Sequence, residues 1–138
     1  MILDNTDLKL LQLLKENARA SYASLARELG ISESAVRKRI AKLVKMGVIK
    51  RFTIEYSLGN EIRAVILVKT SPQVPVPDIS QEILKLRWIE AVYEVTGEYD
   101  ILAMIRANSI KDINDCIDKI RAIKGVSGTY TLIVLRAW

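Results

Sequence analysis

The 138-residue sequence contains no histidine and only one cysteine, Cys116. Without histidine the chain lacks the commonest general base, the commonest metal ligand and every Ser-His or Cys-His nucleophile, which lowers the expectation of catalysis. A lone cysteine cannot form an intramolecular disulfide or, without a second cysteine or a histidine, a typical metal site. We therefore expect Cys116 to be a core thiol and expect neither a metal nor a cofactor.

Long apolar runs are also missing. No stretch approaches the ~18 to 20 apolar residues that cross a bilayer. The first seven residues carry two acids, Asp4 and Asp7, where a secretory leader has a basic segment. Apolar residues make up 50% of the chain and charged residues 27%, as in globular proteins. We expect a cytoplasmic protein that does not contact a membrane.

The positive charge is confined to the first half of the chain. Residues 1–60 hold 11 Lys and Arg against 6 Asp and Glu, whereas residues 61–138 hold 10 of each kind. The net charge of +5 therefore comes entirely from the first 60 residues. A localised basic excess is typical of a surface that binds nucleic acid.

Three short helices are predicted in this basic half, over about 4–17, 21–30 and 32–47. Asp4, Ser21 and Ser32 are good N-cap residues at the three starts. Gly30 and Gly47 follow the second and third helices, where glycine favours the end of a helix. Three helices with a tight glycine turn between the last two form a helix-turn-helix arrangement.

Residues 48–57 alternate β-branched or aromatic with polar residues, which predicts one or two strands. The sequence Leu58-Gly59-Asn60 then ends this pattern. We place the domain boundary there, with a DNA-binding domain and its strand linker over 1–60 and a second domain over 61–138.

The second half has the pattern of a ferredoxin-like domain. Strands are predicted at 62–70, 91–96, 101–107 and 129–135, and helices at about 78–87 and 111–123. The order βαββαβ gives a four-stranded antiparallel sheet with both helices on one face. The other face needs a cover, and a second copy of the domain is the simplest one. The whole chain is thus predicted to be an α+β protein that dimerises through its second half.

The third predicted helix carries most of the charge. Positions 37–51 contain seven basic residues and no acid. Helical phase places Val36, Ile40 and Leu43 on the core face and the basic residues on or beside the opposite face. A solvated helix face is the alternative explanation, but the helix-turn-helix spacing and the charge asymmetry favour DNA binding.

The second helix of a helix-turn-helix lies in the major groove, where its first turns reach the bases. We predict that Ser34, Arg37 and Lys38 contact bases, with Arg37 the best candidate because guanidinium binds guanine O6 and N7 together. The predicted phosphate contacts are Ser32, Arg39, Lys42, Lys45, Lys50 and Arg51. Arg39 borders the core by helical phase, so a structural contact is its alternative role.

The chain resembles the Lrp/AsnC family of prokaryotic regulators, named for the leucine-responsive regulatory protein and AsnC. The resemblance spans nearly the whole chain and lies in Leu25-Ala26, Gly30-Ile31-Ser32, Arg39-Ile40, Gly47-Val48-Ile49, Thr96-Gly97-Glu98-Tyr99-Asp100 and Gly125-Val126. It implies a winged helix-turn-helix, a strand-containing linker and a ferredoxin-like sensor domain of the RAM/ACT-like kind.

The resemblance also implies the partners. Members bind semi-palindromic sites in double-stranded DNA and activate or repress transcription in response to an amino acid or a related metabolite. They form homodimers, which often assemble into tetramers or octamers.

An effector site follows from the same resemblance, because the family's effector lies between sensor domains and contacts the turn that is Gly97, Glu98, Tyr99 and Asp100 here. Asp100 can accept from an ammonium group, and the backbone N–H groups near Gly97 can approach a carboxylate. Thr129 and Thr131 on the last strand, with Tyr130 between them, are secondary candidates. The alternative is that Gly97 and Asp100 only shape a hairpin turn.

Two other functions stay open. An architectural protein could coat DNA through the basic face without reading its sequence. A small ferredoxin-like enzyme could use Glu94, Glu98 and Asp100 as acid–base groups, but these acids have no histidine, phosphate-binding glycine loop or metal-ligand spacing beside them.

Overall fold

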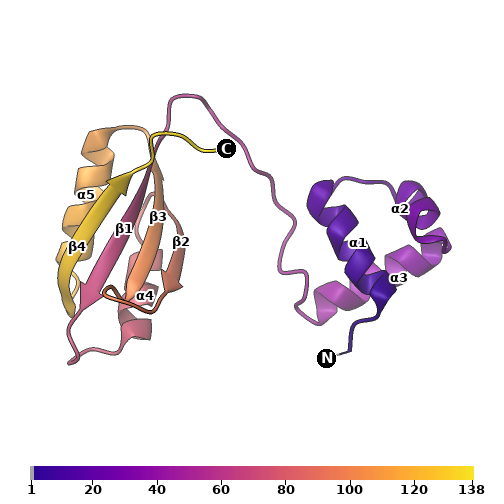
Figure 1. The fold of residues 1–138 in the computed structure, drawn as a ribbon, viewed down its shortest axis with the longest axis horizontal. Helices are drawn as coiled ribbons and strands as arrows, with labels where there is room; N and C mark the ends of the chain where they lie inside the picture. Colours follow the sequence, from indigo (N-terminus) through magenta and orange to yellow (C-terminus); the bar gives the residue numbers. More distant parts are fainter. Residues whose placement is uncertain (1) are drawn as a thin grey trace. The chain divides into compact units, whose positions relative to one another are not determined.

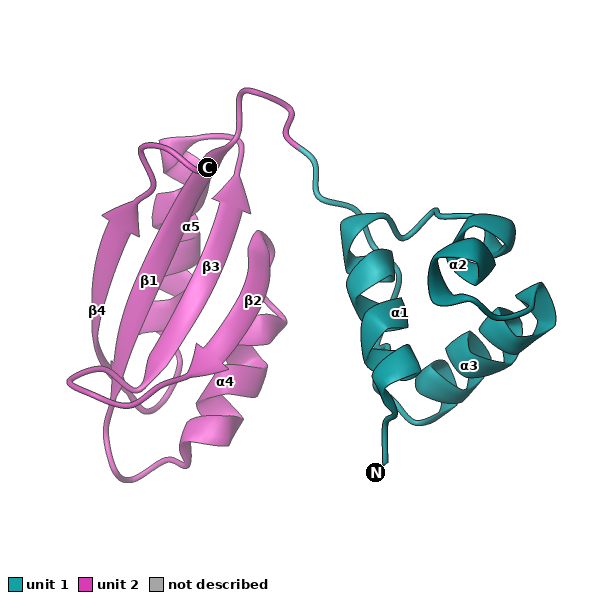
Figure 2. Ribbon diagram, turned by 45° about the vertical axis from the view of Figure 1, so that its right-hand side comes forward, with its two compact units in different colours: residues 1–56 teal, residues 57–138 magenta. Residues whose placement is uncertain are grey.

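The computed structural model describes residues 2–138, which divide into two compact units between residues 56 and 57 (Figure 2). The junction lies shortly before the boundary placed between residues 60 and 61 from the sequence. Each unit has its own hydrophobic core. The units are therefore described separately.

The N-terminal unit contains three helices, α1 (Asn5–Glu16), α2 (Tyr22–Leu29) and α3 (Glu33–Lys45) (Figure 1). The side chains of Asp4, Ser21 and Ser32 each accept a hydrogen bond from the backbone N–H three residues later. These caps confirm the predicted helix starts. Gly30 turns the chain between α2 and α3 at a φ of 66°, a conformation that favours glycine.

The core of this unit is aliphatic and receives side chains from all three helices. Its buried members are Leu10, Leu14, Leu25, Ala26, Val36 and Leu43. Val36 and Leu43 are completely buried, as the phase of α3 predicts. The opposite side of α3 therefore faces away from the core.

The prediction of strands within 48–57 is wrong. No residue from 46 to 61 lies in a strand, and every side chain from 51 to 60 is exposed. A strand needs a partner for its N–H and C=O groups, and residues 2–56 contain no strand that could pair with this segment. Alternation of apolar and polar residues alone does not supply that partner.

The C-terminal unit has the predicted βαββαβ order. Its elements are β1 (Ile62–Thr70), α4 (Val76–Leu84), β2 (Ile89–Glu94), β3 (Ile101–Ala107), α5 (Ile110–Arg121) and β4 (Val126–Ile133). The strands form one antiparallel sheet in the order β2-β3-β1-β4, with both helices on one side (Figure 1). This arrangement confirms the α+β fold class.

Four elements of this unit, α4, β2, α5 and β4, begin and end earlier than predicted. Helix α4 starts at Val76 because Pro77 fits the first turn of a helix, where its missing N–H is not needed. Strand β2 ends at Glu94 and β4 at Ile133, each two residues before its predicted end. Beyond these ends a single backbone hydrogen bond remains at each strand, from the Val95 N–H to the Asp100 C=O and from the Val134 N–H to the Arg63 C=O.

The sheet has two different faces. Successive side chains alternate between the faces, and directly paired residues share one. Ala64, Ile66 and Val68 on β1 are completely buried beneath α4 and α5. We call the other side the open face; it carries Val65, Leu67, Tyr93, Leu102, Met104, Tyr130 and Leu132.

Candidate DNA interface and effector turn

The exposed side of α3 is small, polar and positive. Ser34, Arg37 and Lys38, the predicted base contacts, are all exposed. The predicted phosphate contacts that are also exposed are Ser32, Lys42, Lys45, Lys50 and Arg51. The Ser32 hydroxyl is occupied in part, because it caps α3 by accepting from the Ala35 N–H at 3.1 Å. Among these exposed residues, Lys50 and Arg51 lie beyond the end of α3, and the others belong to the helix or its N-cap.

Two of these basic residues are anchored to α1. Arg39 Nη1 lies 2.7 Å from Asp4 Oδ2 and 2.9 Å from Asp7 Oδ1. Lys42 Nζ lies 2.7 Å from Asp7 Oδ2. The Asp7 side chain is only 1% exposed, whereas those of Arg39 and Lys42 are 27% and 42% exposed. Arg39 therefore has the structural contact offered as its alternative role, and its phosphate contact stays a prediction.

Asp7 combines capping with ion pairing. Its backbone N–H donates to Asp4 Oδ1 at 2.7 Å, and its carboxylate accepts from the Asp4 N–H at 3.2 Å. The hydrogen bond from Lys42 is the main cause that lowers the pKa of Asp7 to about 2, with a further contribution from Arg39; burial acts in the opposite direction. The carboxylate thus stays ionised and fixes the position of α3 on α1.

This geometry predicts an acid-sensitive N-terminal unit. The ordinary pKa of an Asp7 carboxyl is 3.8, and in the folded protein it is about 2. Between these values the unfolded chain binds a proton that the folded chain does not, so the free energy of unfolding should fall as the pH is lowered through this interval. Above it the contribution of Asp7 should be complete and constant.

Chemical denaturation of the full chain at several pH values tests this dependence. Both tryptophans, Trp88 and Trp138, lie in the C-terminal unit and report on it by fluorescence, while far-ultraviolet circular dichroism reports the helices of both units. An N-terminal unit whose unfolding free energy stays constant down to pH 2 would contradict the anchoring role of Asp7.

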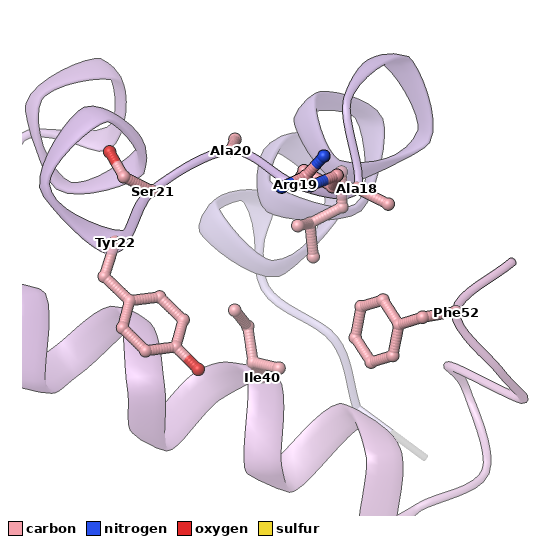
Figure 3. A pocket seen from close by; sticks show the side chains of 8 residues that line it. Ala18, Arg19, Ala20, Ser21, Tyr22, Ile40 and Phe52 are labelled. Carbon is pink, nitrogen blue, oxygen red and sulfur yellow. The ribbon is translucent and has the colours of Figure 1, made fainter. Parts of the chain in front are cut away.

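Arg37 is held differently from Arg39. Its guanidinium carbon lies 5.2 Å from the centre of the Tyr22 ring, which belongs to the first residue of α2. The ring also lines a cavity of about 350 Å³ in this unit, together with Ile40 and Phe52 (Figure 3). Tyr22 was not predicted from the sequence, because the helical phase of α3 does not show which side chain of α2 lies next to Arg37.

The turn between β2 and β3 is held to β1 by Asp100. Asp100 Oδ2 accepts hydrogen bonds from the backbone N–H and the hydroxyl of Thr70, both at 2.9 Å. These two bonds lower the pKa of Asp100 below its ordinary value. Gly97 has a φ of 114°, which favours glycine at this point of the turn. The hydrogen bonds of Asp100 and the conformation of Gly97 therefore shape this turn, as the hairpin alternative requires. Asp100 remains ionised within it.

The predicted effector residues do not all lie on one side of the sheet. The rings of Tyr99 and Tyr130 approach each other, with 6.3 Å between their centres. Thr129 and Thr131 pair with the buried residues Val68 and Ile66, so their side chains lie on the helix-covered face. The Thr129 hydroxyl accepts from Arg121 Nε of α5 at 3.0 Å. The structure brings Tyr130 to the turn but leaves the two threonine hydroxyls on the opposite face.

Among residues 2–138, no group of three or more acidic or cysteine side chains is placed to hold a metal ion. No helix in the same range has the length and apolarity needed to cross a membrane.

A helix-turn-helix unit with an exposed basic second helix, followed by a separate βαββαβ unit, is typical of a DNA-binding protein with an added α+β domain. Family models agree with both halves: a winged helix-turn-helix DNA-binding domain matches residues 3–50, and the Lrp/AsnC ligand binding domain matches residues 63–138. The chain belongs to the Lrp/AsnC family.

Individual relatives support this assignment along the full length. The HTH-type transcriptional regulator LysM of Sulfurisphaera tokodaii is 58% identical, over 98% of this chain and 96% of that protein. The regulator FL11 of Pyrococcus furiosus is 34% identical, over 98% of this chain and 91% of that protein. The structure of E. coli AsnC is similar with a TM-score of 0.82 at 30% identity, covering 99% of this chain and 95% of that one. The protein is a DNA-binding transcriptional regulator with a ligand-binding domain.

Proposed function

We propose that the protein is a sequence-specific regulator that inserts α3 into the major groove and responds to an amino acid or a related metabolite. The observation that carries the proposal is the position of α3: its apolar side is buried, Asp7 anchors it to α1, and its first turns expose Ser34, Arg37 and Lys38. Anchoring fixes the helix, which base recognition requires, because base contacts need defined side-chain positions.

A homodimer is the second part of the proposal, and the open face supports it. Tyr93, Tyr130 and Leu132 are 56%, 54% and 45% exposed in the single chain. Together with the other residues of the open face they form a contiguous apolar surface, which rarely stays uncovered in a soluble protein. A second copy of the same face is self-complementary under two-fold symmetry and would hold two copies of α3 together for a semi-palindromic site. Assembly of such dimers into tetramers or octamers would add binding by avidity.

Replacing Leu67, in the middle of the open face, with arginine is expected to convert the dimer to a monomer. Two arginines brought into an apolar interface would be buried without partners. The exposed Leu84 on α4 lies outside the sheet, so Leu84→Arg is the matched control. Analytical ultracentrifugation should show a monomer for L67R and the wild-type mass for L84R. A dimeric, folded L67R protein would exclude the open face as the interface.

The effector part of the proposal concerns the turn from Gly97 to Asp100. Asp100 Oδ2 is used by Thr70, but Oδ1 accepts no hydrogen bond within residues 2–138. This carboxylate can therefore bind the ammonium group of an amino acid while it keeps its structural bonds. Glu98 is exposed and adds negative charge, and Tyr99 and Tyr130 offer an apolar wall.

Asp100→Asn is expected to abolish the effector response while DNA binding without effector stays intact. Asparagine keeps an oxygen that can accept from Thr70 but loses the charge that an ammonium group requires. Thr70→Val is the control, because it removes one structural hydrogen bond and leaves the Asp100 charge. DNA binding should be measured by fluorescence anisotropy with each standard amino acid in turn. A response that persists in D100N, or that is lost equally in T70V, would leave Asp100 as a turn residue only.

A further inference from the structure

We propose that Tyr22 is a positioning residue that holds the Arg37 guanidinium for base recognition and so helps to determine the preferred base pair. The proposal rests on the base contact proposed for Arg37. Its starting point is the 5.2 Å distance between the guanidinium carbon and the centre of the Tyr22 ring, which is within the range of a cation–π interaction.

The three cations of α3 that contact other helices fall into two kinds. Arg39 and Lys42 are neutralised by the carboxylates of Asp4 and Asp7. Arg37 has no acidic partner within the described residues and is restrained by an aromatic ring. A ring restrains a guanidinium without taking up its N–H donors, whereas a carboxylate occupies them. Arg37 therefore keeps both its charge and its donors for DNA.

Restraint matters because arginine loses much rotamer freedom when it binds a base with two parallel hydrogen bonds. A guanidinium that already lies against a ring has fewer conformations to lose. The ring itself is well placed for this role, since Tyr22 follows the Ser21 cap and so begins α2 at a fixed point. The contact crosses directly between the two helices of the helix-turn-helix.

The experiment uses the full chain and the DNA site that the wild-type protein selects from random duplexes, together with copies of that site changed at single base pairs. Tyr22→Leu removes the ring but keeps apolar volume, and leucine favours a helix more than tyrosine does. Tyr22→Phe keeps the ring. Phe52→Leu is the matched control, because Phe52 lines the same cavity as Tyr22 from the other side of Ile40 (Figure 3).

We expect Y22L to weaken binding to the selected site by about two- to fivefold, the range of an exposed cation–π contact. The loss of affinity should depend on the same base pair at which Arg37→Ala removes the preference. In a protein that already carries R37A, Y22L should cause no further loss of affinity. Y22F and F52L should bind as the wild type does.

Each other outcome has a separate meaning. If R37A leaves all base preferences unchanged, the proposed base contact of Arg37 fails before Tyr22 is tested. If R37A changes a preference but Y22L does not, or if Y22L weakens all sequences equally, Tyr22 has no positioning role. If Y22F loses as much as Y22L, the hydroxyl and not the ring matters, and the proposal is overturned.

Discussion

Asp7→Asn is expected to destabilise the N-terminal unit by about 2–4 kcal/mol, the range for losing charge-assisted hydrogen bonds from a buried carboxylate. Asp7 is completely buried and joins α1 to α3 through Lys42 and Arg39. Asparagine keeps the shape but removes the charge that both cations require. Because a unit of this size has a small core, such a loss is a large part of its stability.

Asp4→Asn is the matched control for this prediction. Asp4 makes the same kind of ion pair with Arg39, but its side chain is 53% exposed. Asparagine is also a good N-cap, so the loss of stability should be clearly smaller than for Asp7→Asn. Denaturant titrations of both variants, followed by circular dichroism and tryptophan fluorescence, give the comparison. Equal costs for the two variants would contradict the special role of the buried carboxylate.

Arg37→Ala is expected to reduce discrimination at one base pair of each half-site by about tenfold to a hundredfold, as loss of a bidentate contact does. Lys45→Ala serves as the comparison, because Lys45 is exposed in the last turn of α3, where a phosphate contact is predicted. It should weaken binding to all sequences alike and lower the salt slope by about one.

Competition binding against single-base-pair variants of the site, at several salt concentrations, separates the two classes of contact. If R37A scales the affinity for every sequence by the same factor, Arg37 contacts only phosphates. Ser34 or Lys38 would then have to account for any sequence preference.

The fold was largely predictable because its signals are local. Caps at Asp4, Ser21 and Ser32 fix the helix starts, and the strands β1 and β3 have the predicted bounds. The wrong prediction of strands within 48–57 has a different cause. Alternation of apolar and polar residues is a local pattern, whereas strand pairing depends on distant parts of the chain. Helix α4 begins two residues before its predicted start because Pro77 fits a first helical turn.

The site was predicted less completely, because its contacts join distant parts of the chain. The helical phase of α3 predicted that Arg39 borders the core. The sequence of α3 alone does not show that Arg39 forms ion pairs with Asp4 and Asp7 at the start of α1. A partial signal existed: the two acids are spaced as a capping box, which places both carboxylates at the start of α1. For Tyr22 the sequence offers no comparable signal. For Thr129 and Thr131, alternation along a strand already places both on the face opposite Tyr130, but only the pairing with β1 shows that this is the helix-covered face.

Selection of bound sequences from random duplex DNA, repeated with each standard amino acid, tests the central claim most directly. The account predicts that the full chain enriches a semi-palindromic motif, in keeping with two copies of α3 held by a dimer, and that one amino acid or a close relative changes the enrichment. Uniform recovery of all sequences under every condition would contradict it and would favour a protein that coats DNA without reading its sequence.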